Sequence, residues 1–330
     1  MSKKCVIITS INPPNNVINF YANETDHDLI IVGDTKTPNS YKDVNCIFLD
    51  LESQKKIYPL ISAKISVKHY ARKNIGYIYA IKHGYNTIYD TDDDTLPYNQ
   101  NWLDTPYSYS KVVSGGIINL YRLFSNDLIW PRGFPLNKIR NSDTILYRDS
   151  TESDISSLAV TNGLIDLDPD VDAIFRLTSP NFTTNYKFIN NHLSFILESD
   201  VIFPSNTQNT IWLKKEIFIF MYIPSTVSFR YCDILRSYIL LYGLRSLNLK
   251  LGIHGSNVYQ IRNEHDLMKD FYDEVPVYTS FNTLITTLDT IDLNTNSKTL
   301  MKNIYSKLAS VDIVKADEMD ILNLWLDFFD

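Results

Sequence analysis

Short hydrophobic runs alternate with longer amphipathic stretches through the first hundred residues. Runs rich in β-branched residues predict strands at residues 5–9, 29–32, 46–49 and 87–89. Between the last two strands, residues 66–84 carry a helical pattern that closes with two basic residues and a glycine. Strands that alternate with helices form βαβ units, so the pattern predicts an α/β fold with a mostly parallel sheet. In such sheets ligands bind at the carboxyl ends of the strands.

The rest of the chain shows three further patterns. Residues 99–154 are irregular and rich in Tyr, Asn, Ser and Pro, whereas residues 160–280 return to mixed α/β with an apolar helix at 233–244. After a polar linker, residues 297–310 and 316–329 have the spacing of two amphipathic helices. We expect these helices to pack on the main domain, and the alternative is a contact between copies of the chain in a homo-oligomer.

Composition excludes several classes of protein. The 330 residues are 44% hydrophobic, which is too apolar for a disordered chain, and the net charge of −7 argues against sequence-independent binding to nucleic acid. Cys5, Cys46 and Cys232 lie far apart without CxxC spacing, which favours a reducing compartment over a disulfide framework or a zinc site. The N-terminus lacks a signal-peptide pattern, and no apolar run approaches the ~20 residues of a membrane span. We therefore expect a cytoplasmic protein without a membrane span.

Four carboxylates follow the strand predicted at 87–89, in the sequence IYDTDDDT: Asp90, Asp92, Asp93 and Asp94. Two carboxylates ~4 Å apart repel by about 4 kcal/mol at an effective dielectric constant near 20, so such a cluster is hard to keep ionised without a cation. Hard oxygen ligands favour Mg²⁺ or Mn²⁺, and Mg²⁺ usually combines one or two carboxylates with substrate phosphates. The alternative interpretation is a solvated acidic turn.

Spacing separates this cluster from two other metal motifs. A calcium-binding EF-hand loop that began at Asp90 would need Gly where Thr95 stands and Glu where Asn101 stands. A phosphatase motif of the DxDx[TV] type also fails, because neither pair of aspartates has Thr or Val two residues after its second member. What remains is the DxD arrangement of nucleotide-sugar glycosyltransferases, in which carboxylates hold a cation that bridges the donor diphosphate.

The segment around the cluster, YARKNIGYIYAIKHGYNTIYDTDDD (Tyr70–Asp94), resembles the STELLO family of glycosyltransferase-like proteins. The likeness continues in order through IIVGDTKTP (residues 30–38), WPRGFPL (Trp130–Leu136), DPDVDAIFRLT (Asp168–Thr178), PSTVSFRYCDILRSY (Pro224–Tyr238) and QIRNEHDLMKDF (Gln260–Phe271). A weaker likeness extends to plant reversibly glycosylated polypeptides, which also carry a triple Asp. The resemblance implies a GT-A fold, a Rossmann-type mixed sheet with a metal-dependent nucleotide-diphosphate site.

This chain departs from the STELLO pattern at both ends. The family carries an N-terminal membrane anchor that has no counterpart here, and residues 279–330 match no part of the family pattern. The matching segments spread one site across residues 9–265. We therefore expect a single GT-A-like domain at residues 1–278, followed by a C-terminal helical extension at residues 279–330.

The resemblance and the strand ends together give a nucleotide-sugar site. Its expected members are Thr9, Ser10, Asp34, Arg72, Lys73, Asn74, Asp92 and Asp93. Thr9 and Ser10 end the first strand, and Asp34 is placed to accept a hydrogen bond from a ribose hydroxyl or a base. Arg72 and Lys73 would bind the diphosphate, Arg72 through a fork of parallel hydrogen bonds. A plain turn and a solvated helix face are the alternatives.

The expected catalytic residues are Asp233, Asp172 and Arg176, and the expected metal ligands are Asp92, Asp94 and His265. Asp233 is the candidate base that takes the acceptor hydroxyl proton in an inverting transferase, and its alternative role is a helix cap. Asp172 and Arg176 would contact the donor sugar or the acceptor. His265 is equally well placed for a diphosphate contact or for the surface.

The sequence thus predicts a metal-dependent glycosyltransferase that moves a sugar from a nucleotide-diphosphate donor to a glycan, protein or small-molecule acceptor, with Mg²⁺ or Mn²⁺ as cofactor. Two alternatives stay open. One is a catalytically silent GT-A-like protein that binds nucleotide sugar or acts as a scaffold, and the other is a sugar-nucleotide mutase.

Overall fold

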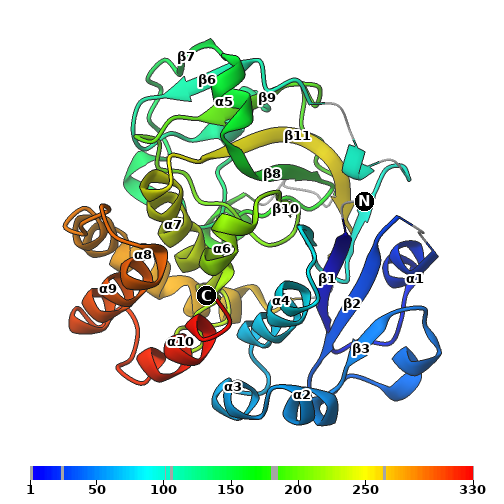
Figure 1. The fold of residues 1–330 in the computed structure, drawn as a ribbon. Helices are drawn as coiled ribbons and strands as arrows, with labels where there is room; N and C mark the ends of the chain where they lie inside the picture. Colours follow the sequence, from blue (N-terminus) through cyan, green and yellow to red (C-terminus); the bar gives the residue numbers. More distant parts are fainter. Residues whose placement is uncertain are drawn as a thin grey trace.

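The computed structural model describes residues 3–23, 26–100, 102–104, 107–179, 185–262 and 265–329. Within these residues, eleven strands form one mixed sheet flanked by helices (Figure 1). The strands are β1 (Lys4–Ser10), β2 (Asp28–Gly33), β3 (Ile47–Leu49), β4 (Thr87–Asp90), β5 (Thr95–Pro97), β6 (Lys111–Ser114), β7 (Leu146–Asp149), β8 (Leu158–Asp166), β9 (Ser194–Leu197), β10 (Thr210–Trp212) and β11 (Lys250–Gln260). Their order is β3-β2-β1-β4-β10-β8-β11-β9-β6-β7, with β5 paired to β11.

The α-helices connect and cover these strands. They are α1 (Asn16–Asn23), α2 (Leu51–Ile57), α3 (Pro59–Lys64), α4 (Lys73–Lys82), α5 (Glu152–Ser156), α6 (Ala173–Thr178), α7 (Cys232–Ser246), α8 (Leu267–Leu288), α9 (Ser297–Ser310) and α10 (Glu318–Leu326). Strands β3, β2, β1 and β4 are parallel, whereas β10 runs antiparallel to both β4 and β8. The predicted α/β class with a Rossmann-like mixed sheet is confirmed.

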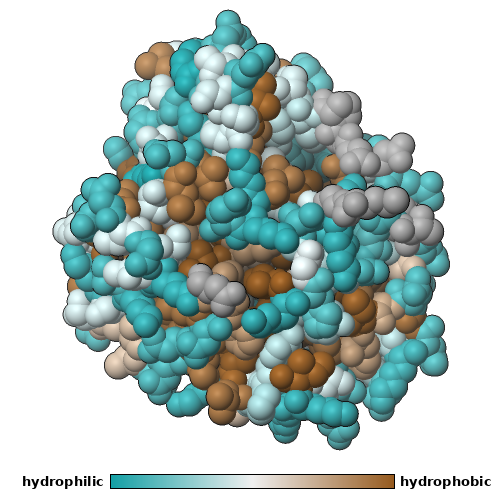
Figure 2. All heavy atoms as spheres, viewed as in Figure 1, coloured by the Kyte–Doolittle hydropathy of each residue, from teal (hydrophilic) through white to brown (hydrophobic). Residues whose placement is uncertain are grey.

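Alternate residues of β1 face two separate hydrophobic clusters. Ile7 belongs to the larger cluster with Ile75 and Ile78 of α4, while Val6 belongs to the smaller cluster with Ile18 of α1. This alternation follows from the two-residue side-chain period of a strand, and it buries the sheet on both faces. Figure 1 shows α4 on one side of β1 and β2 and α1 on the other. On the face shown in Figure 2, hydrophobic side chains lie in several separate groups among hydrophilic ones.

Gly76 allows α4 to lie directly on the sheet. A Cβ atom at this position would stand 2.7 Å from Val32 Cγ2 and 2.8 Å from Ile7 Cγ2. A mid-helix glycine costs about 1 kcal/mol relative to alanine, so close packing is the reason for its presence. At the end of α4, Gly84 has φ +78° and terminates the helix as the sequence predicts. The helix itself begins at Lys73 rather than at residue 66, because residues 70–72 form a 3₁₀ turn.

The segment predicted to be irregular contains regular elements. Residues 99–154 include β6, β7 and part of α5. Two of these elements are strands of four residues at the sheet edge, and the strand β7 is exposed throughout. Such short strands lack the hydrophobic alternation that sequence periodicity detects.

The C-terminal helices pack against the body of the protein, as predicted. Leu300, Ile304, Leu322 and Trp325 are fully buried and belong to the same hydrophobic cluster as α4 and α7. The expected boundary between residues 278 and 279 falls inside the continuous helix α8, so the structure does not divide the chain there. Figure 1 shows α8 and α9 beside α7, and α10 between α9 and α3. No helix among the described residues is both long enough and apolar enough to span a bilayer.

Glu318 connects α10 by hydrogen bonds to the loop that follows Tyr222. Its side chain is fully buried and accepts hydrogen bonds from the Tyr222 hydroxyl, from Ser225 N (3.0 and 3.1 Å) and from Thr226 N (2.7 Å). Glu318→Gln would turn an amide NH₂ toward these donors and leave hydrogen-bonding groups unsatisfied, at a cost of about 2 kcal/mol. We expect that loss in the free energy of unfolding measured by urea denaturation.

The matched control for this substitution is Asp320→Asn on the same helix. Asp320 is 63% exposed and pairs with Lys64 at the surface, so its substitution should change the unfolding free energy by less than about 0.5 kcal/mol. Equal losses for the two variants would contradict a specific role for Glu318.

Candidate active site

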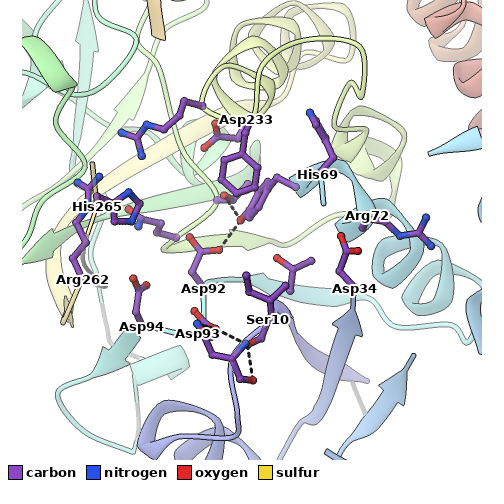
Figure 3. A pocket seen from close by; sticks show the side chains of 18 of the residues that line it. Ser10, Asp34, His69, Arg72, Asp92, Asp93, Asp94, Asp233, Arg262 and His265 are labelled. Carbon is purple, nitrogen blue, oxygen red and sulfur yellow. Dashed lines mark hydrogen bonds between the residues drawn. The ribbon is translucent and has the colours of Figure 1, made fainter. Parts of the chain in front are cut away.

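A cavity of about 530 Å³ opens where β1, β2 and β4 end, at the carboxyl edge of the parallel strands. Its lining comes from segments far apart in the sequence, including Thr9 and Ser10 after β1, Asp34 after β2, and Asp92, Asp93 and Asp94 after β4. Figure 3 shows the three aspartates below the centre of the cavity, with Asp233 above them, Arg262 and His265 on one side and Asp34 on the other. The structure thus brings together most of the residues that the sequence singled out.

The four clustered aspartates divide into one buried residue and three that line the cavity. Asp90 is fully buried, with Lys73 Nζ at 2.6 Å and Arg236 Nη1 at 3.0 Å as its counter-ions. Asp92, Asp93 and Asp94 line the cavity. Asp90 therefore stabilises the interior with the two cations, and only the other three carboxylates face a ligand.

Each cavity aspartate is held by neighbouring polar groups. Asp92 Oδ1 accepts from the Tyr70 hydroxyl at 2.6 Å, with Lys73 Nζ at 3.5 Å. Asp93 Oδ2 accepts from Ser10 Oγ at 2.5 Å and from Asn12 Nδ2 at 3.0 Å, and Asp94 Oδ2 accepts from Gln260 Nε2 at 2.9 Å. The carboxylates are therefore oriented before any ligand binds.

Burial opposes the ionisation of Asp92 and Asp94. It raises the pKa of Asp94 to about 7, with the Asp92 charge as the next cause, and it raises the pKa of Asp92 despite the lowering effect of Lys73. A cation would relieve the cost of holding these charges together. The residues fit Mg²⁺ or Mn²⁺ held by one or two carboxylates and completed by substrate phosphates, the usual mode of Mg²⁺ binding.

The predicted three-ligand metal set is not assembled. Among the described residues, no group of three His, Cys, Asp or Glu side chains is placed to hold a metal ion. His265 lines the cavity, but its Nδ1 lies 3.2 and 3.3 Å from the two carboxylate oxygens of Asp270. We therefore reassign His265 from the metal to a pair with Asp270.

Arg72 is among the residues that line the cavity and Lys73 is not, and neither cation is turned into the cavity as expected. Arg72 is buried, and its guanidinium donates to Ile65 O at 2.9 Å, to Ser62 O at 3.1 Å and to Gln54 Oε1. In Figure 3 it points away from the cavity. Lys73 is fully buried against Asp90. These two side chains hold the cavity wall in place, and the structure does not put them where they would contact a diphosphate.

Asn74 also contacts the protein interior rather than the cavity. Its side chain is fully buried and exchanges two hydrogen bonds with the backbone of Ile223, at 2.7 and 2.8 Å. It ties α4 to the chain before the Pro224 loop and does not border the cavity. The nucleotide contact expected of Asn74 has no geometric support.

The expected nucleoside contacts do border the cavity. Thr9 and Ser10 line it at the end of β1. Asp34 also lines it, and its carboxylate accepts from Lys68 N and Thr35 N, each at 2.6 Å. Asp34 therefore orders the loop beside the strand end as well as offering oxygen atoms to a ligand.

Asp172 and Asp233 occupy different settings from those expected. Asp172 is fully buried, caps α6 through Phe175 N at 2.7 Å, and accepts from Trp130 Nε1 at 2.7 Å. Burial raises its pKa to about 7. It does not line the cavity, so its position is that of a structural cap rather than a sugar contact.

Asp233 lines the cavity but is tightly paired. Arg132 donates to both of its carboxylate oxygens, at 2.7 and 2.9 Å, and also to both oxygens of Asp170, at 2.9 and 3.1 Å. All three side chains are buried. A carboxylate whose two oxygens already accept from a guanidinium is poorly placed to take a proton, so this geometry does not support Asp233 as the base.

Asp166, Asp168 and Asp170, which alternate along the chain before α6, each have a polar partner within the protein. Asp168 pairs with Arg176 at 2.6 Å, Asp170 pairs with Arg132, and Asp166 accepts from the Tyr98 hydroxyl at 2.8 Å. Each carboxylate thus has its own partner. Arg176 lines the cavity, where the sequence expected a sugar or acceptor contact.

Sequence reasoning missed three arginines of the cavity lining: Arg132, Arg230 and Arg262. Each lies within a segment that carries the STELLO resemblance, namely WPRGFPL, SFRYC and QIRNEH. For Arg132, a cation inside the largely apolar segment WPRGFPL was the available signal, since buried arginines are rare unless paired.

Comparison with known proteins agrees with the resemblance. The chain is similar to probable glycosyltransferase STELLO1 of Arabidopsis thaliana, with 24% identity over 257 residues, and to probable glycosyltransferase STELLO2 of the same plant, with 23% identity over 257 residues. Each match covers 72% of this chain and 33% of the relative, so the chain spans about a third of the length of these proteins. No known protein-family model matches it. The predicted STELLO-like character is confirmed.

Proposed function

We propose that this chain is a glycosyltransferase domain of the GT-A type that takes a nucleotide-diphosphate sugar as donor, together with Mg²⁺ or Mn²⁺. One observation carries the proposal: Asp92, Asp93 and Asp94 follow β4 at the carboxyl edge of a Rossmann-like sheet and face a cavity of about 530 Å³. Ligand cavities of this size are typical for small molecules, and this edge of an α/β sheet is where they bind. The similarity to probable glycosyltransferases supports the same function.

The cavity lining suggests an order for the parts of the donor. The nucleoside would lie beside Thr9 and Asp34, and the diphosphate would lie over Asp92 and Asp94. A divalent cation held by these two carboxylates would neutralise the charge that develops on the leaving diphosphate. Tyr70 and Lys73 orient Asp92, so they position the cation site.

His265 is the cavity residue best placed to receive a proton from an acceptor. Asp270 lies against its Nδ1 atom, and a carboxylate in that position fixes the tautomer and leaves Nε2 as the basic atom. This role replaces the one expected of Asp233, whose oxygens are held by Arg132.

The paired state of Asp233 also suits the second candidate, a protein that binds nucleotide sugar without turning it over. Such a protein would need the donor cavity but no free base. Binding and turnover must therefore be measured separately.

The test is a screen of nucleotide sugars with the wild-type chain in Mn²⁺, in Mg²⁺ and in a chelator. We expect metal-dependent binding by calorimetry and metal-dependent release of nucleoside diphosphate. Asp92→Asn should reduce that release about 100-fold or more, since it removes a cation ligand, while Asp43→Asn at an exposed position outside the cavity serves as the control.

Three outcomes separate the candidates. Metal-dependent binding with turnover supports the transferase. Binding without hydrolysis or transfer to any acceptor supports the silent binding protein. If no nucleoside diphosphate binds in a metal-dependent manner, both are rejected.

A further inference from the structure

The cavity wall opposite Asp34 is formed by cationic side chains. Arg176, Arg230 and Arg262 all line the cavity, and their side chains are 9%, 12% and 10% exposed. In Figure 3, Arg262 lies across the cavity from Asp34, with Asp92 between them. We call the surface formed by these three arginines the arginine wall.

The acids that balance the arginine wall lie behind it. Arg262 Nη2 donates to Asp270 at 2.7 Å, Arg230 Nη2 donates to Glu274 at 2.5 Å, and Arg176 Nη2 lies 2.6 Å from Asp168. None of these three acids belongs to the cavity lining of the described residues. A ligand in the cavity therefore meets the guanidinium groups rather than Asp168, Asp270 or Glu274; Asp170, whose pKa Arg230 helps to lower, is an acid that does line the cavity.

The three guanidinium groups are close enough to repel one another. Burial lowers the pKa of Arg262 to about 10, and the charges of Arg176 and Arg230 lower it further in the same direction. Arg176 and Arg230 therefore add to the electrostatic cost of a charged Arg262. An anion placed among them would offset both the repulsion and the lost hydration, and guanidinium groups match carboxylate and phosphate geometry.

The arginine wall adjoins Asp94, since Ile261 N, next to Arg262, donates to Asp94 O at 3.0 Å. The role of the wall rests on the proposed function. If the nucleoside lies beside Asp34 and the diphosphate over Asp92 and Asp94, the arginine wall faces the part of the cavity beyond the diphosphate. That part receives the transferred sugar and the acceptor. We infer that Arg176, Arg230 and Arg262 form a second anion subsite, which binds a carboxylate or phosphate group carried by the sugar or by the acceptor.

The test measures binding by calorimetry in Mn²⁺, with wild type, Arg262→Met, Arg176→Met and, as a matched control, Lys68→Met on the nucleoside side of the cavity. The ligands are the tightest nucleoside diphosphate, its neutral hexose derivative and its hexuronate derivative. Free hexuronate and a hexose phosphate, each added with saturating nucleoside diphosphate, serve as the acceptor arm. Thermal melting confirms that each variant is folded.

If the anion belongs to the sugar, wild type binds the hexuronate donor at least tenfold more tightly than the neutral donor. If it belongs to the acceptor, wild type binds the free anionic sugars instead. In either case Arg262→Met and Arg176→Met should abolish that preference and leave nucleoside diphosphate affinity within twofold, whereas Lys68→Met should leave the preference intact. Arg262→Lys, which keeps the charge, should restore part of it.

Two results would overturn the inference. The first is that Arg262→Met loses as much affinity for the nucleoside diphosphate as for the anionic sugar or donor. That result would assign the arginine wall to the donor diphosphate. The second is a wild type that prefers neither anionic sugars nor anionic donors. If no nucleoside diphosphate binds at all, the binding of inorganic phosphate is measured instead. If wild type binds phosphate and Arg262→Met does not, the anion subsite is retained although the proposed function fails. If wild type binds no phosphate, the anion subsite and the proposed function are both rejected.

Discussion

Asp94→Asn is expected to weaken metal-dependent donor binding about 10- to 100-fold and, in the absence of metal, to make the protein more stable above pH 7. The first effect arises from the loss of a cation ligand, and the second from the raised pKa of Asp94, which burial and the Asp92 charge bring to about 7. A carboxylate must lose its proton to bind a cation. Donor affinity in the wild type should therefore fall as the pH drops below 7, approaching tenfold per pH unit, and Asp94→Asn should lose most of this dependence.

The stability effect has the opposite sign to that of an ordinary ion-paired carboxylate. Because the pKa of Asp94 is higher in the folded chain than in the unfolded chain, the folded state binds more protons between about pH 4 and pH 7. Stability without metal therefore falls as the pH rises through that window. Allowing for the partial exposure of Asp94, we expect Asp94→Asn to gain about 1–2 kcal/mol at pH 8 and little at pH 4.

Urea denaturation at pH 4.5 and pH 8 with a chelator, paired with calorimetry at pH 5.5 and pH 8 with Mn²⁺, measures the two effects. Asp43→Asn is again the control, since its carboxylate is exposed and outside the cavity. Wild-type donor affinity that is the same at pH 5.5 and pH 8 would contradict the role of Asp94 in holding a cation. An Asp94→Asn protein no more stable than wild type at pH 8 would contradict the electrostatic cost of the triad.

The sequence predicted those parts of the structure that short-range patterns determine. The strands β1, β2 and β4 and the helices α7 and α9 follow from hydrophobic periodicity, and the aspartates after β4 are a local cluster at a strand end. The α9 boundaries, Ser297–Ser310, match the predicted range because a clear amphipathic repeat follows a polar linker.

The direction of a charged side chain depends on contacts that no local pattern contains. Arg72 and Lys73 are adjacent in sequence, yet one guanidinium turns to the carbonyls of Ser62 and Ile65 while the other cation turns to Asp90. Neighbouring helical residues point about 100° apart, and which direction meets the cavity is decided by the packing of α4. The sequence therefore located the cavity correctly at the strand ends but could not tell the residues that face it from those behind it.

Arg132→Met is expected to cause the largest loss of stability, about 3–5 kcal/mol in the free energy of unfolding at pH 7. Arg132 is buried and joins two buried carboxylates, Asp170 and Asp233, which come from segments 38 and 101 residues away. Burial alone would raise the pKa of Asp170, but Arg132, with smaller contributions from Arg230 and Asn206, outweighs burial and lowers it. Without the Arg132 guanidinium, both carboxylates would remain buried without the cation that bonds to both of them.

The pH dependence of this loss distinguishes a missing charge from a packing defect. In the wild type the lowered pKa of Asp170 stabilises the fold above about pH 4, and that contribution is lost as the pH falls. In Arg132→Met the carboxylates can take up protons, so the difference from wild type should shrink as the pH approaches 4. Adding Asp170→Asn and Asp233→Asn to Arg132→Met should recover part of the stability at pH 7, which a cavity left by the missing side chain would not allow.

Arg140→Met at an exposed position is the matched control, with an expected change below about 0.5 kcal/mol. A loss of stability in Arg132→Met that is the same at pH 4.5 and pH 8 would mean that Arg132 acts through packing.

The single variant Asp233→Asn then tests whether Asp233 takes part in the reaction. If Asp233 serves as a counter-ion, its substitution lowers stability and leaves the turnover of the folded protein largely intact, because Arg132 keeps Asp170 and the cavity wall in place. If turnover vanishes while stability is preserved, Asp233 is the base after all and the ion pair with Arg132 must open during the reaction.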